Sequence, residues 1–159
     1  MLKNFLWVFF ISMVPLIELR GAIPVSQALK LPVISSYIVS IIGNMIPVPF
    51  IFLFARKFLE WGKDKRLVGG ICRFFLLRGT SAGEKMQAKA GRGLYFALFL
   101  FVGIPLPGTG AWTGTLAASL LDLDGKKTSL AVMGGVLLAG VIMLVLTLLG
   151  FGAASAVAG

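Results

Sequence analysis

The sequence predicts an all-α integral membrane protein built as an inverted repeat. Each half is expected to hold a re-entrant helical hairpin and one full transmembrane helix, and a basic cytoplasmic linker with an interfacial helix joins the halves. Of the 159 residues, 58% are hydrophobic and 13% are charged, and the mean hydropathy of +0.97 exceeds that of soluble domains. A segment broken by proline and glycine occurs twice, about ninety residues apart.

The composition excludes several classes of function. The net charge is +9, but long apolar runs leave no soluble basic face, so we expect no nucleic-acid partner. The chain has no histidine and one cysteine, which removes histidine bases, zinc sites and disulfide frameworks. Neither an aspartate-rich cluster nor a nucleophile–base pair lies in the apolar segments. We therefore expect a protein that is not an enzyme, with no cofactor and no metal.

The first repeat is predicted over residues 1–55. Its hairpin, residues 4–31, consists of two apolar arms separated by the segment PLIELRGAIP, with breaks at Pro15 and Pro24. Pro24 would occupy the first turn of the returning helix, whose free N–H groups would point at the break. Residues 33–55 are long enough for a full span.

The second repeat is predicted over residues 93–159. Its hairpin, residues 94–121, is interrupted by PLPGTGAWTG, with breaks at Pro105 and Pro107. Residues 128–150 form the second span. Two broken segments at corresponding positions of two halves are typical of a transporter binding site.

The linker, residues 56–92, carries ten of the fifteen Lys and Arg residues. The positive-inside rule places it in the cytoplasm together with Lys126 and Lys127, so the two hairpins open on opposite faces and both termini are external. Within it, the segment LVGGICRFFLLRG is too short and too charged to span, and we expect an interfacial helix that lies flat.

The segment PLIELRGAIP (residues 15–24) is called the first break below. It holds Glu18 and Arg20, a pair of ionisable residues near the expected midplane. Such residues are costly in a membrane and are therefore candidates for function. We interpret Glu18 as the proton-coupling residue, and Arg20 with Gly21 as binding an anionic substrate at a helix N-terminus. The alternative is that Glu18 and Arg20 pair with each other or lie near the interface, and only tolerate the turn.

The segment GIPLPGTGAWTG (residues 103–114) is called the second break below, and it carries no charged residue. Its glycines permit positive φ angles and a close approach of the backbone to a ligand. The predicted substrate-binding residues here are Gly108, Thr109, Gly110, Trp112 and Thr113, and the alternative is that they only form a turn.

Two helix faces stand out in the spans. Ser36, Ser40 and Asn44 share one face of the first span, where Asn44 is the strongest candidate for substrate contact and helix packing is the alternative. In the second span Ala131, Gly135 and Ala139 form a small-residue ridge, which we interpret as a candidate contact of a homodimer.

The segments PLIELRGAIP (residues 15–24) and GIPLPGTGAWTG (residues 103–114) resemble the small multidrug export protein family, distant relatives of the DedA (VTT, SNARE-associated) membrane proteins. The resemblance implies the same inverted repeat, in a prokaryotic-type inner (plasma) membrane. DedA relatives are associated with proton-motive-force-dependent movement of lipids such as undecaprenyl phosphate. Glu18 would match their proton-coupling acidic residue. No arginine follows Pro107-Gly108, so Arg20 would have to stand in for the arginines of the second DedA hairpin.

Our leading hypothesis is a proton-coupled secondary transporter or flippase that moves an anionic lipid head group, such as a polyprenyl phosphate, between the two breaks. One alternative is a proton-coupled exporter of small cationic drugs, in which Glu18 binds the cation. Another is a membrane scaffold that transports nothing. The expected partners are membrane lipid, a small-molecule or lipid substrate, and protons.

Overall fold

A computed structural model confirms the all-α prediction. It describes the backbone of residues 1–90 and 93–158 and the side chains of residues 1–88 and 93–150. Arg92 and Gly159, the predicted ends of the linker and of the second repeat, lie outside the described residues. The helices are α1 (Leu2–Met13), α2 (Glu18–Ala28), α3 (Val33–Met45), α4 (Pro47–Phe50), η1 (Ile51–Ala55), α5 (Arg56–Gly62), α6 (Gly69–Ala90), α7 (Leu94–Gly103), α8 (Ala111–Leu120) and α9 (Gly125–Ala158).

Two helical runs are long and apolar enough to cross a membrane, as predicted: Val33–Gly62 and Gly125–Gly150. Only about a third of each apolar window is buried inside the chain. The first run does not end at Pro47 and Pro49. Instead, it continues as η1, a π-helical turn that follows directly after the prolines, where N–H groups are missing from the ladder.

Helix α3 is polar inside and apolar outside. Three of its polar side chains, Ser36, Ser40 and Asn44, are at most 1% exposed, whereas three of its isoleucines, Ile34, Ile38 and Ile42, are at least 50% exposed. The exceptions are Ser35, which is exposed, and Ile41, which packs against the core. A helix of a water-soluble protein has the opposite arrangement. The exposed isoleucines therefore favour a lipid environment for this helix.

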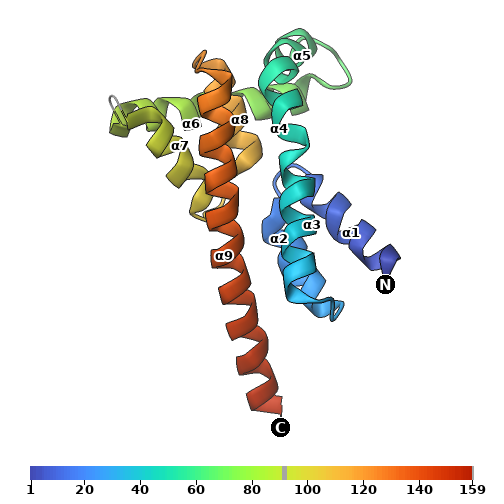
Figure 1. Cartoon of the computed structure of the whole chain (residues 1–159). Helices are drawn as coiled ribbons and strands as arrows, with labels where there is room; N and C mark the ends of the chain where they lie inside the picture. Colours follow the sequence, from blue (N-terminus) through green and yellow to red (C-terminus); the bar gives the residue numbers. More distant parts are fainter. Residues whose placement is uncertain (91–92, 159) are drawn as a thin grey trace.

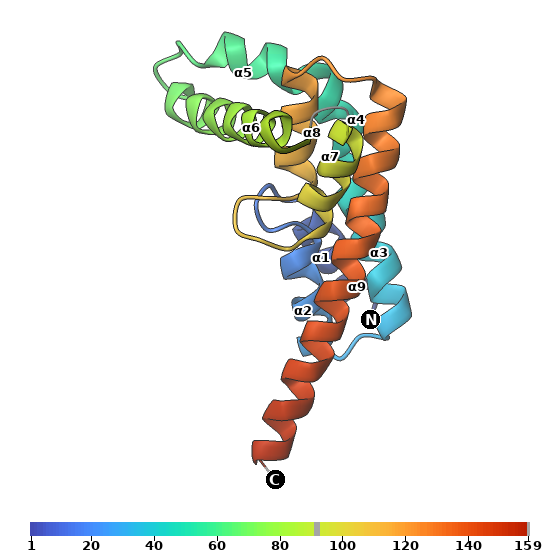
Figure 2. The same ribbon diagram turned by 90° about the vertical axis from the view of Figure 1, so that its left-hand side faces the viewer.

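The two long runs are antiparallel, and the two breaks meet on one side of them. In Figure 1, α3 and α4 lead up to α5, while α9 starts at the end near α5 and α6 and descends to the C-terminus. The turn between α1 and α2 and the turn between α7 and α8 lie beside each other partway along α9 in both views (Figures 1 and 2).

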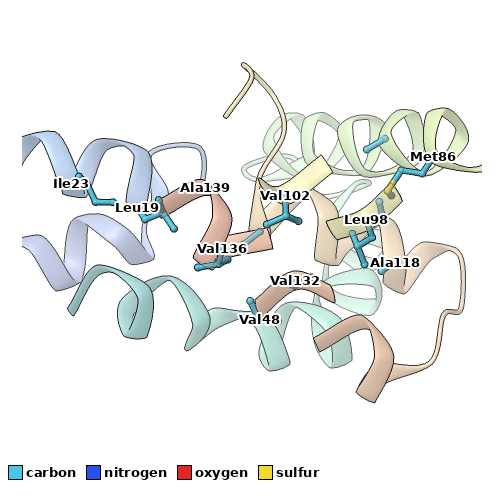
Figure 3. Close-up of a cluster of buried hydrophobic side chains, with 13 residues drawn as sticks. Leu19, Ile23, Val48, Met86, Leu98, Val102, Ala118, Val132, Val136 and Ala139 are labelled. Carbon is cyan, nitrogen blue, oxygen red and sulfur yellow. The ribbon is translucent and has the colours of Figure 1, made fainter. Parts of the chain in front are cut away.

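A continuous core connects the two halves through α9. Figure 3 shows Leu19 of α2 beside Ala139 of α9, and Val102 of α7 beside Val136. These four side chains are at most 2% exposed. Helix α9 thus packs against a helix of each predicted hairpin and fixes their relative position.

The small-residue ridge of α9 is used inside the chain. A Cβ atom built on Gly135 would lie 2.6 Å from Cβ of Val102 and 2.8 Å from the Phe99 carbonyl oxygen, both in α7. The interpretation of this ridge as a dimer contact is therefore wrong, because the glycine permits close packing of α7 instead. The homodimer stays a prediction and must use another face.

Helix α6 is longer than the segment predicted to be interfacial, and it is tied to the rest of the fold. A Cβ on Gly79 would lie 2.7 Å from Cγ of Leu116 in α8, and the buried Cys72 faces Gly62 of α5. In Figure 2, α5 and α6 lie side by side and across the direction of α9. If α9 spans a membrane, α6 lies along its surface.

The prediction that Pro24 begins the returning helix is wrong. Helix α2 starts six residues earlier, at Glu18, and contains Pro24 in its interior. The chain turns instead over residues 14–18, where Leu16 has a φ of 72° and Glu18 a φ of 53°. These positive φ angles reverse the chain before Pro24 is reached. Pro15, Pro105 and Pro107 do lie in the breaks between helices.

We predict that Gly135→Ala destabilises the protein. The added methyl group meets the carbonyl oxygen of Phe99, which cannot move without shifting α7, and overpacking of this kind costs about 1–3 kcal/mol. Gly150→Ala is the matched control, because it changes the same residue type in the same helix. There the added Cβ atom would meet no neighbouring side chain or helix within 4 Å. Thermal unfolding of the purified proteins in detergent measures the difference. Equal melting temperatures would contradict the close packing of α7 on α9.

Candidate functional site

The first break presents Glu18 to the second half of the chain through a strained turn. Leu16 and Glu18 both adopt the left-handed region, which costs a non-glycine residue roughly 1–3 kcal/mol. Leu16 is 51% exposed, whereas Glu18 is 3% exposed. The turn therefore spends conformational energy to direct a carboxylate inward.

The Glu18 carboxylate caps a helix of the other half. Its Oε2 accepts a hydrogen bond from the backbone N–H of Ala111 at 3.1 Å, and its Oε1 accepts one from Trp112 at 2.9 Å. These N–H groups are the first two of α8, whose own N-cap residue, Gly110, has no side chain to offer. A negative charge at a helix N-terminus is also favoured by the helix dipole. Glu18 thus occupies the position in which an external anion would bind.

The place where the Glu18 carboxylate meets the start of α8 is called the junction below. Gly110 is required there for two reasons. Its φ of 134° lies in a region that other residues rarely adopt, and a Cβ atom there would overlap both carboxylate oxygens of Glu18. Gly108, with a φ of 83°, forms the turn just before it. The glycines of the second break therefore allow the carboxylate to reach the backbone.

Arg20 is bound to the other end of the second break. Its guanidinium donates hydrogen bonds to the carbonyl oxygen of Leu106 and, at 2.8 Å, to Oγ1 of Thr109. The same hydroxyl lies within hydrogen-bonding distance of the carbonyl oxygens of Ile104 and Leu106. Among the described residues Arg20 forms no ion pair with Glu18, so the pairing half of the alternative is wrong, whereas a position near the interface without a function stays open.

The remaining predicted site residues fall into two groups. Trp112 joins the junction, because its indole Nε1–H donates to the carbonyl oxygen of Met13 at 3.2 Å, and Thr113 follows it with 7% exposure. Gly21 packs against Ile17 within the first half. Asn44 is buried in α3, and no described residue provides a hydrogen-bond partner for either of its amide atoms.

Sequence reasoning missed Arg78. This residue of α6 stacks on Phe74, with 4.9 Å between the guanidinium carbon and the ring centroid, and its Nη1 would lie 3.0 Å from a Cβ on Gly108. A guanidinium group therefore does lie against the Pro107-Gly108 turn, but it comes from the linker. Its charge had been attributed to topology, and only its position four residues after Phe74 on one helix face hinted at a separate role.

A large cavity opens beside the second break. It has a volume of about 960 Å³ and lies between α6, α7 and residues 104–109. Its lining is mostly apolar, with Arg78 and Lys85 as the charged members among the described residues. A second cavity of about 470 Å³ lies between η1, α5, α6 and α8, and includes Trp112 and Thr113 in its wall.

Comparison with known proteins gives a family match. Residues 18–142 match the family described as "Putative small multi-drug export protein". No curated protein and no solved structure is significantly similar to the chain. The matched range covers more than half of the chain. It contains residues 18–24 of the first break, the whole second break, the linker and most of the apolar part of α9. The chain therefore belongs to the small multi-drug export protein family.

Proposed function

We propose that the helix pairs α1–α2 and α7–α8 are re-entrant hairpins that enter the membrane from opposite faces. Helices α1 and α7 have 12 and 10 residues, fewer than the roughly 20 that a span requires. Their turns lie beside each other partway along α9 (Figure 2). The basic linker and Lys126-Lys127 share one end of α9, which supports a cytoplasmic linker and external termini.

We further propose that the protein is a proton-coupled membrane transporter for a lipid-like anion. The observation that carries this proposal is the Glu18 carboxylate at the N-terminus of α8. This position attracts phosphate and carboxylate groups in general, since free N–H groups and the helix dipole act together. The chain holds its own anion where the head group of a substrate would bind.

Protonation of Glu18 would couple proton binding to substrate binding. A neutral carboxyl group forms weaker hydrogen bonds than a carboxylate, so a bound proton loosens the contact with Ala111 and Trp112. A phosphate could then accept hydrogen bonds from the N–H groups of Ala111 and Trp112, while Arg20 lies close by at Thr109. The proton removes one negative charge from the junction as the substrate brings another, so both bind to the same open state.

Export of a cationic drug is the second candidate, and two observations favour it. The family description names drug export, and Arg20 is turned toward Leu106 and Thr109, so that Glu18 has no ion-paired cation among the residues that the structure describes. A drug cation could take that place after the carboxylate leaves α8. The two candidates differ in the charge of the substrate.

We expect Glu18→Gln to abolish transport driven by a pH gradient. Glutamine keeps the size of the side chain but cannot exchange a proton. The measurement is transbilayer movement of a labelled polyprenyl phosphate in proteoliposomes, with and without a pH gradient. Glu84→Gln, which removes the same charge from an exposed position on α6, is the control and should behave as wild type. Gradient-driven transport that persists in Glu18→Gln would overturn the coupling role.

Arg20→Ala separates the two candidate substrates. Its guanidinium attracts an anionic head group at the junction and repels a cation. We expect the variant to bind a lipid phosphate more weakly than wild type, whereas tighter binding of a cationic dye would favour drug export. Equilibrium binding of both probes to the same detergent-purified protein gives the comparison.

Gly110→Ala should weaken the junction itself. The methyl group displaces the Glu18 carboxylate, and the backbone strain alone costs about 1–3 kcal/mol. Gly70→Ala is the control, because nothing lies within 4 Å of that position. A lower melting temperature for Gly110→Ala than for Gly70→Ala is expected in detergent. Equal melting temperatures would show that the stability of the protein does not depend on the contact between Glu18 and α8.

A further inference from the structure

We propose that the cavity beside α6 binds an anionic phospholipid of the leaflet that faces the linker, with its phosphate on Arg78 and Lys85 and its acyl chains along α7. The cavity is separate from the contact between Glu18 and α8 on which the proposed transport rests, so lipid binding can be tested without a transport measurement. The cavity volume of about 960 Å³ is far larger than a phosphate alone needs. Its occupant must therefore fill apolar space as well as meet positive charge.

Charge is arranged on one side of the cavity. Arg78, Ser81 and Lys85 lie three and four residues apart on α6 and therefore share one helix face. Among the described residues that line the cavity, none is acidic. Arg78 is half-buried and forms no hydrogen bond or ion pair with any described residue, so its donors remain available. A phosphate matches this combination of a guanidinium, a hydroxyl and an ammonium group.

The opposite side of the cavity is apolar. Phe96, Leu100 and Ile104 line it along α7 and the start of the second break, and Phe96 is 65% exposed. Hydrocarbon chains can cover this surface without burying an unpaired polar group. The cavity thus has a cationic end and an apolar end, as an anionic lipid does.

The orientation of the helices agrees with that of a lipid in a leaflet. Helix α6 lies across the end of α9 that carries Lys126 and Lys127, whereas α7 runs from α6 toward the junction of the breaks (Figures 1 and 2). A head group at α6 would lie at the membrane surface and its chains would point into the bilayer. Basic side chains at this level attract anionic lipids of the cytoplasmic leaflet.

A lipid bound here would also contact the second break. The cavity wall includes Leu106, Pro107 and Gly108, and the Arg78 guanidinium lies against Gly108. A phosphate on Arg78 would therefore fix the turn from the linker side, while Arg20 holds it from the first break. The lipid would be part of the wall of the junction.

The test is native mass spectrometry of the detergent-purified protein with phosphatidylglycerol or phosphatidylcholine at equal concentration. Wild type should retain phosphatidylglycerol preferentially. The double variant Arg78→Gln/Lys85→Gln should lower that preference about tenfold, which corresponds to about 1.4 kcal/mol. Lys57→Gln/Arg66→Gln removes two positive charges from exposed linker positions outside both cavities, and should retain the preference. An equal loss in both double variants, or no loss in either, would overturn the site.

A photoreactive phosphatidylglycerol with a diazirine on its acyl chain locates the lipid without relying on the fold of a variant. In wild type it should label residues 94–104, and phosphatidylcholine with the same diazirine should label them less. Lys85→Gln alone changes an exposed side chain and should lower the labelling of this segment. Labelling confined to other helices, or equal labelling by both lipids, would refute the proposal.

Discussion

The contact between the Glu18 carboxylate and the first N–H groups of α8 is the interaction on which the arrangement of the two breaks depends. Helix α8 is buried along most of its length, so its N-terminus has little access to water. Unpaired N–H groups in such a place are costly, especially in a membrane. Gly110 cannot cap the helix, because it has no side chain. An acceptor must come from elsewhere, and the first break supplies it.

Glu18 and Arg20 are only two residues apart, yet they bind opposite ends of the same break. Arg20 donates to the carbonyl oxygen of Leu106, just beyond the C-terminus of α7, and Glu18 accepts from the N-terminus of α8. The Glu18 charge therefore meets the helix end of opposite polarity, whereas Arg20 meets a carbonyl oxygen of the break itself, which also accepts from the N–H of Thr109. Had the two side chains paired with each other, the first N–H groups of α8 would have lacked this acceptor. Mutual separation of the two charges is what joins the two halves of the chain.

Proline, glycine and charge predicted the positions of both breaks and both long helices, because those signals act locally. The turn at Leu16 and Glu18 escaped prediction, since neither residue type favours a positive φ and the contacts with α8 that help to stabilise it come from a distant part of the sequence. The ridge at Gly135 was assigned to a dimer because small residues permit close packing but do not name the partner. Arg78 was missed for a similar reason: a charge that sets topology can also line a cavity.

Under the proposed function, the same structure also explains why the closed junction could open. Oγ of Ser40, both amide atoms of Asn44, and Oγ1 of Thr115 and of Thr128 are buried without a partner in the described part of the chain. Such groups gain free energy when water or a polar head group reaches them. The Glu18 carboxylate opposes that gain by holding the two breaks together. Under this proposal, a proton on Glu18 weakens the contact with α8 and so favours an open state, in which water could reach those of these groups that lie near the breaks.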